Sequence, residues 1–136
     1  MDNKKSKLEI LGITLVLLMT ILQGFYGVFA FLDPVAFSNV RGTELFSSMD
    51  SDWVNIYASR TLFITLTFSF LLYNRQYSII MWSALFAIIM PITDGFLAYQ
   101  AEAPFKVVFK HFATILYLII TFFVLKSVLR KNRTSQ

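Results

Sequence analysis

Residues 8–32 read LEILGITLVLLMTILQGFYGVFAFL, an almost unbroken apolar run. A helix needs about 20 residues to cross the hydrocarbon core of a bilayer, so this run is long enough to span a membrane. Three further runs of similar length and character follow, at residues 54–73, 77–99 and 105–125. We therefore predict an all-α membrane protein, a four-transmembrane-helix antiparallel bundle in which residues 1–136 form a single integral membrane domain.

The composition agrees with this class and excludes several kinds of chemistry. Hydrophobic residues make up 57% of the chain, and the apolar runs lack the two-residue alternation of a membrane β-strand. The chain has no cysteine, so it cannot form a disulfide, a thiolate metal site or a Cys-ligated cluster. Its single histidine excludes bis-His haem within one subunit. We predict no cofactor and no metal site, and a homo-oligomer stays open.

The basic residues are distributed unevenly about the four predicted spans. Three cations, Arg41, Lys106 and Lys110, fall on the side that also holds most of the acids. The other side carries the eight cations Lys4, Lys5, Lys7, Arg75, Lys126, Arg130, Lys131 and Arg133. By the positive-inside rule both termini are cytoplasmic, in a multi-pass protein of the cell membrane that we place in a bacterial inner membrane. The predicted partner of these cations is therefore the lipid bilayer and not nucleic acid.

The first run could also belong to a cleaved signal peptide. It is longer than the usual apolar core of about 7–15 residues, and no A-x-A site closes it. We therefore expect a retained helix. Gly24 and Gly27 in its outer half would let a neighbouring helix approach closely.

Local signals delimit the elements between the spans. Asp33-Pro34 ends the first span, and the outer loop 33–52 mixes acids with apolar residues. This mixture indicates a segment on the membrane surface, either an ordinary connector or a short helical lid over the mouth of the bundle. Asp52 is the expected N-cap of the second helix. Only residues 74–76 separate the second and third spans, which we expect to pack as antiparallel neighbours.

The third span contains Pro91, one turn before Asp94. Proline lacks the amide hydrogen that would bond to the carbonyl of Ala87, so we expect an unpaired carbonyl and a bend there. Lys106 and Lys110 open the fourth span and are read as cations that extend to the membrane surface.

The candidate site is a layer of polar side chains inside the apolar runs. Counted at 1.5 Å per residue, Arg60, Asp94 and His111 all lie about 7–9 Å below the outer ends of their spans, and Tyr26 lies at a similar level. Ionisable residues inside a membrane are rare and mark functional sites by default. Two alternatives remain open. The three residues could only stabilise the bundle through contacts between helices, or Arg60 and His111 could each reach water separately.

Within this layer we predict that Arg60 pairs with Asp94, because a guanidinium can bind a carboxylate with two parallel hydrogen bonds. Tyr57 lies one turn from Arg60 and could donate to the same carboxylate. His111 could accept a hydrogen bond from Tyr57 or bind Asp94. The predicted ligand-binding residues are therefore Tyr57, Arg60, Asp94 and His111.

These residues also carry a resemblance. Phe31-Leu32-Asp33-Pro34, Tyr57-Ala58-Ser59-Arg60, Pro91-Ile92-Thr93-Asp94 and His111 resemble the pattern of small bacterial four-helix integral membrane proteins of an uncharacterised domain-of-unknown-function family (4267/4345 type), distantly similar to DoxX-like proteins. The resemblance spans residues 11–125, implies a four-helix membrane fold and supplies no reaction. The segment after Arg60 lacks the glycines usual in that family.

Several functions remain open at this stage. The first is a protein without enzymatic activity, whose polar layer is structural or binds a small amphipathic, lipid-like molecule. The second is a membrane isomerase or cyclase that uses Asp94 as acid or base and His111 as proton shuttle. A proton-coupled exporter and a quinone-binding component of a larger oxidoreductase are further alternatives.

Overall fold

The computed structural model describes residues 6–43, 45 and 47–134, so Lys4 and Lys5 of the charge prediction lie outside the described residues. Four helical segments in this part of the chain are long and apolar enough to cross a membrane. They are α1 (Lys7–Leu32), α3 (Ser51–Tyr73), the consecutive helices α4 (Tyr77–Phe86) and α5 (Ile89–Gln100), and α6 (Phe105–Thr134). Each predicted span lies within one of them, and the predicted all-α bundle is confirmed.

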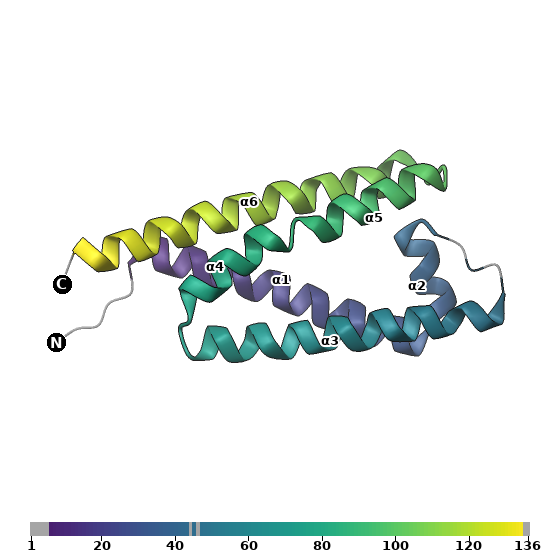
Figure 1. Cartoon of the computed structure of the whole chain (residues 1–136), viewed down its shortest axis with the longest axis horizontal. Helices are drawn as coiled ribbons and strands as arrows, with labels where there is room; N and C mark the ends of the chain where they lie inside the picture. Colours follow the sequence, from purple (N-terminus) through teal and green to yellow (C-terminus); the bar gives the residue numbers. More distant parts are fainter. Residues whose placement is uncertain (1–5, 44, 46, 135–136) are drawn as a thin grey trace.

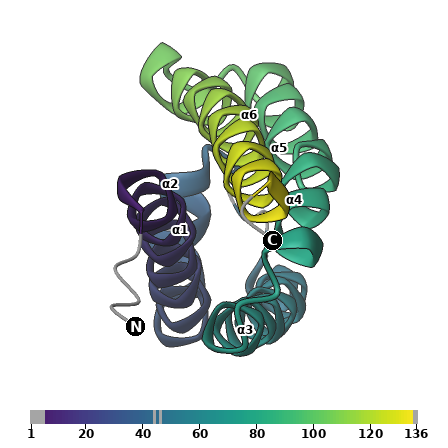
Figure 2. The same cartoon turned by 90° about the vertical axis from the view of Figure 1, so that its left-hand side faces the viewer.

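The helices are arranged as two groups (Figures 1 and 2). α1 packs chiefly against α3, whereas α6 packs against α4 and α5 and also against α1. The second and third predicted spans therefore meet through α3 and α4 beside their connecting turn, but the main partner of α3 is α1. The short helix α2 (Pro34–Arg41) stands across the end of the bundle opposite the termini, between α3 and the α5–α6 pair (Figure 1).

Capping residues explain where α1 and α2 begin and end. Ser6 Oγ accepts a hydrogen bond from the Glu9 amide at 3.2 Å and caps the start of α1. Asp33 ends α1 and begins α2, since its Oδ1 accepts from the Ala36 amide at 2.9 Å and Pro34 takes the first helical position. The prediction that Asp33-Pro34 ends the first span is confirmed.

The start of α3 differs from the prediction. The short 3₁₀ helix η1 (Ser48–Asp50) leads directly into it, and Asp50 is the N-cap residue. The predicted N-cap Asp52 is wrong, because the helix begins two residues earlier than that cap would imply and places Asp52 in its first turn. A carboxylate there still interacts favourably with the positive end of the helix dipole.

The third span is interrupted between α4 and α5, at Ala87 and Ile88. This break lies one turn before Pro91, where the missing amide hydrogen predicts it. The carbonyl of Ala87 is not unpaired as expected, however. It accepts from the Met90 amide at 3.1 Å, because the chain tightens locally into a shorter-range turn.

Apolar packing is divided between the two ends of the bundle. Near the termini the core consists of Val16, Tyr77, Ile80, Met81, Leu125 and Val128. Near α2 it is built around Ala30, Phe37 and Ala58. Gly27 brings α1 and α3 together as predicted, since a Cβ there would lie 2.8 Å from Leu62 Cγ.

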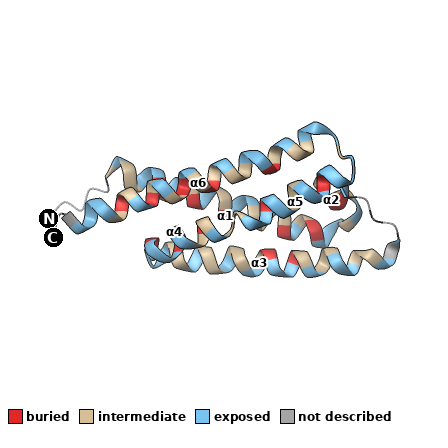
Figure 3. Ribbon diagram, turned by 45° about the horizontal axis from the view of Figure 1, so that its top comes forward, coloured by how far each residue is buried: buried red, intermediate tan, exposed pale blue. Residues whose placement is uncertain are grey.

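The outer faces of the helices are largely exposed (Figure 3). Phe63 and Leu66, for example, are each 70% exposed. In water such a surface would be unfavourable, whereas lipid chains would cover it. The exposed apolar faces therefore agree with a multi-pass membrane protein.

Candidate functional site

The site is organised by α2, whose sequence fits a short helix docked by one face. Phe37 and Ser38 are buried, while Val35, Asn39 and Val40 are exposed. The Phe37 ring stands edge-on to Phe29 of α1, with centroids 5.8 Å apart, and lies 5.2 Å from the ring of Tyr57 of α3. These aromatic contacts anchor α2 on the α1–α3 pair.

Arg41, the last residue of α2, connects three helices. Its Nη2 forms a salt bridge with Asp94 Oδ1 of α5, and its Nη1 donates to the Tyr57 hydroxyl at 3.0 Å. The guanidinium also lies 4.8 Å from the centroid of the Tyr57 ring, within cation–π distance. The Arg41 and Asp94 side chains are 17% and 26% exposed. This partly buried pair therefore joins α2 to both halves of the bundle.

The end of α2 also rests on the first turns of α6. Lys110 Nζ donates to the carbonyl of Val40, which a helix C-terminus leaves without an intrahelical partner. Gly42 follows in the left-handed conformation, with φ +82°, and a Cβ there would lie only 2.7 Å from Val107 Cγ1. Lys110 therefore has a partner within the protein, and its predicted extension to the membrane surface stays a prediction. Lys106 is exposed.

His111 follows Lys110 and is 6% exposed. It packs over Gly95 of α5, where a Cβ would lie 3.2 Å from His111 Cβ. The ring lies within the electrostatic influence of Arg41, Asp94 and Lys110. Its Nε2 is buried and has no hydrogen-bond partner among the described residues. A buried polar atom of this kind requires an explanation, such as a water or a ligand.

The predicted pair between Arg60 and Asp94 is wrong. Arg60 is exposed on α3, and the cation that reaches Asp94 is Arg41. The physical reason is that α2 lies between α3 and α5, so its terminal side chain meets the carboxylate first (Figure 1). Tyr57 does belong to the cluster, although it binds Arg41 and not Asp94. Tyr26 contributes to the packing around Phe37, at 6.0 Å between ring centroids.

Sequence reasoning missed Arg41 and Lys110 as members of the cluster. One signal was available for Arg41. Pro34 begins an eight-residue segment and Gly42 follows it, and proline at the first position with glycine just past the end is typical of a helix. That signal places Arg41 in the last turn. Which groups it would meet there depends on where the helix docks, and no local pattern contains this information.

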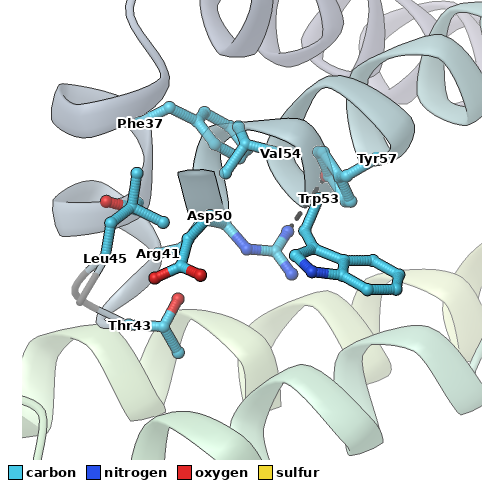
Figure 4. Close-up of a pocket in the computed structure, with 9 residues that line it drawn as sticks. Phe37, Arg41, Thr43, Leu45, Asp50, Trp53, Val54 and Tyr57 are labelled. Atoms are coloured by element: carbon cyan, nitrogen blue, oxygen red, sulfur yellow. Dashed lines mark hydrogen bonds between the residues drawn. The ribbon is translucent and has the colours of Figure 1, made fainter. Parts of the chain in front are cut away.

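A pocket of about 310 Å³ lies beside Arg41, between α2 and the start of α3 (Figure 4). Its walls are Phe37, Ser38, Arg41, Thr43, Leu45, Asp50, Trp53, Val54 and Tyr57. The Arg41 guanidinium extends along the pocket toward Tyr57 (Figure 4). Of the four predicted binding residues only Tyr57 lines it. Asp94 is connected to the pocket through Arg41, and Trp53, 73% exposed, lies at its edge.

The donor set does not resemble a metal centre. Within the described ranges, no three His, Asp or Glu side chains come together as metal ligands. The cluster instead brings together a guanidinium, a phenol and a carboxylate, which are hydrogen-bonding groups engaged with one another.

The comparisons with known proteins give a family but no activity. Neither the curated proteins nor the solved structures contain a significant match to the chain. The predicted likeness to DoxX proteins and the bacterial origin stay predictions. Residues 11–125, which include Tyr57, Asp94 and His111, match the family described as Domain of unknown function (DUF4267). The chain therefore belongs to the DUF4267 family.

Proposed function

We propose that this protein is a membrane receptor or carrier for a small amphipathic, lipid-like molecule, which it binds in the pocket beside Arg41. The observation that carries the proposal is the convergence of polar groups from α2, α3, α5 and α6 next to a pocket with mostly apolar walls. Small-molecule pockets usually have this composition, with a few placed polar groups that orient the ligand. The volume of about 310 Å³ suits a headgroup and the first part of a chain.

Different residues of the site would contact the polar and the apolar parts of the ligand. Arg41 and Tyr57 face the polar head, and Asp94 holds the guanidinium in position from behind. Phe37, Leu45 and Val54 contact the apolar part. Because Asp94 neutralises much of the charge of Arg41, a neutral or zwitterionic head with hydrogen-bonding groups fits better than a strongly anionic one.

The proposed setting is the outer leaflet of a cell membrane, with both termini in the cytoplasm. The excess of basic residues at the end of the bundle that holds the termini supports this orientation. Trp53, exposed at the edge of the pocket, suits the aromatic belt at a membrane interface. A ligand could then enter laterally from the leaflet.

The test is mass spectrometry of lipid extracts from gently purified protein. Thr43 lines the pocket and is exposed, so Thr43→Trp should fill the pocket without removing a polar contact of the cluster. Ser47→Trp introduces the same side chain at an exposed position of the same loop and outside the pocket. We expect one stoichiometric molecule in the wild type and in Ser47→Trp, and its loss in Thr43→Trp. Equal amounts in all three, or none in any, would contradict the proposal.

A second function is favoured by one observation, the buried Nε2 of His111 that lacks a partner among the described residues. In an isomerase or cyclase this atom would shuttle a proton and Asp94 would act as acid or base. His111→Gln should then retain the bound molecule and stop its conversion. The engagement of Asp94 by Arg41 weighs against a proton-coupled exporter, which needs a carboxylate that exchanges protons freely.

A further inference from the structure

A second pocket lies at the opposite end of the molecule, on the outer face of α6. Its volume is about 220 Å³, and its walls are Phe123, Lys126, Ser127 and Arg130. These positions are spaced three, four and seven residues after Phe123, so all four lie on one face of the helix. We propose that this pocket binds the headgroup of an anionic phospholipid.

The face of α6 below the pocket has the character of a lipid-chain contact. Leu116, Ile120 and Phe123 continue the same face toward the middle of the helix and are 52%, 47% and 57% exposed. The apolar face therefore ends directly at the two cations. This order, an apolar stripe followed by a basic pocket, matches a phospholipid, in which acyl chains are followed by a phosphate.

The polar groups of the pocket suit a phosphate. Lys and Arg bind phosphate oxygens with charge-assisted hydrogen bonds, and Arg can do so with two parallel bonds. The Lys126 ammonium lies 5.8 Å from the centroid of the Phe122 ring, which favours a position close to the helix surface. Ser127 Oγ donates to the Phe123 carbonyl at 2.9 Å, so its hydroxyl hydrogen is already used within the helix.

Charge complementarity extends beyond the pocket. The described cations at this end include Lys7, Arg75, Lys131 and Arg133 in addition to those of the pocket. The acid described here is Glu9, whose Oε1 accepts from the Tyr77 hydroxyl at 3.1 Å. Such an end attracts anionic lipids, and each juxtamembrane cation contributes about 1 kcal/mol. The pocket would give this general attraction one defined position.

Native mass spectrometry of the full chain in detergent, with phosphatidylglycerol or phosphatidylcholine added, tests the proposal. We expect the wild type to retain one phosphatidylglycerol in preference to phosphatidylcholine. The double variant Lys126→Gln/Arg130→Gln should bind it about 30-fold more weakly, which corresponds to two contacts of about 1 kcal/mol each. Both side chains are exposed, so the variant should fold, and its melting temperature in detergent alone checks this.

Two controls separate a site from a general attraction. Arg60→Gln/Lys106→Gln removes two exposed cations at the other end of the bundle and should leave phosphatidylglycerol binding unchanged. Lys126→Gln/Arg130→Gln/Gln76→Lys/Asn132→Lys keeps the net charge of the basic end but moves it to other exposed positions, and should bind as weakly as the double variant. Full recovery in this charge-matched variant, or equal retention of both lipids by the wild type, would overturn the proposal.

Discussion

At the scale of single residues, the properties of Arg41 explain why the candidate site holds together. A guanidinium offers five donors in a fixed plane, so it can bind a carboxylate and a phenol at once. In this protein Asp94 and Tyr57 take these roles from two different helices. A partly buried charge is costly without its counter-charge, so removing either partner should lower the free energy of unfolding markedly.

Asp94→Asn and Arg41→Leu should each lower the free energy of unfolding by about 2 kcal/mol, because each leaves the other partner partly buried without its counter-charge. The double variant should recover part of this loss, and equilibrium unfolding in mixed micelles measures all three. Arg60→Leu is the matched control, since Arg60 is exposed and should show no coupling to Asp94. Strictly additive effects of the Arg41 and Asp94 substitutions would refute a direct interaction.

Lys110→Met should loosen α2 without unfolding the bundle. The substitution keeps most of the aliphatic chain but removes the donor to the Val40 carbonyl, at a cost of about 1–2 kcal/mol. Amide hydrogen exchange in α2 should therefore become faster, while exchange in α1 and α6 stays unchanged. Lys106→Met alters an exposed lysine one turn away and should leave α2 protected. Unchanged amide exchange of α2 in Lys110→Met would show that Lys110 does not stabilise the end of this helix.

At the scale of elements, α2 is too short to be stable alone. It has eight residues, and isolated helices shorter than about 12 residues are marginal in water. Its stability must come from Asp33 and Gly42 at its ends and from the packing of Phe37. Since Arg41 is presented by this helix, the polar cluster exists only while α2 is docked.

Gly42→Ala tests this dependence. The φ of +82° disfavours any side chain, and the new Cβ would approach Val107 Cγ1 to 2.7 Å, so we expect a loss of about 1–3 kcal/mol. Gly24→Ala is the comparison, because its Cβ would meet the Thr65 methyl at 3.1 Å inside a regular helix and should cost less. Thermal unfolding in detergent ranks the two. A larger loss for Gly24→Ala would show that the docking of α2 is not tight at this point.

At the scale of the whole molecule, the bundle has two chemically different ends. The end with the termini is rich in cations, and the end with α2 carries the ion pair and the first pocket. An amphipathic ligand at one end and an anionic lipid at the other would contact the same chain from opposite surfaces of the bilayer.

This asymmetry predicts the orientation in the membrane. The chain has no cysteine, so single-cysteine variants report cleanly on each side. Ser47→Cys near α2 should react with a membrane-impermeant reagent added to intact cells, and Asn132→Cys at the end of α6 should not. Both positions are exposed in the structure. Labelling of Asn132→Cys but not of Ser47→Cys would show the opposite orientation.

The sequence by itself determined the class of the fold and the position of most ends of the four spans. Hydrophobic runs longer than about 20 residues predict spans without any tertiary information, because each helix satisfies its own backbone hydrogen bonds. Asp33-Pro34 and Pro91 act in the same local way, through a missing amide hydrogen and a fixed φ. His111 is buried, while Asp94 and Tyr57 are only partly buried, and choosing all three as candidates needed only the cost of polarity in lipid, which depends on depth.

The partner of Asp94 was decided by the tertiary structure alone. Counting residues placed Arg60 at the right depth, but depth does not say which way a side chain faces or which helix stands next to it. α2 docks on the bundle through Phe37 and through its C-cap Gly42. This docking brings Arg41 to Asp94, whereas Arg60 stays exposed. A pair of opposite charges forms between the groups that packing brings together, and packing is a property of the assembled helices and not of any one segment.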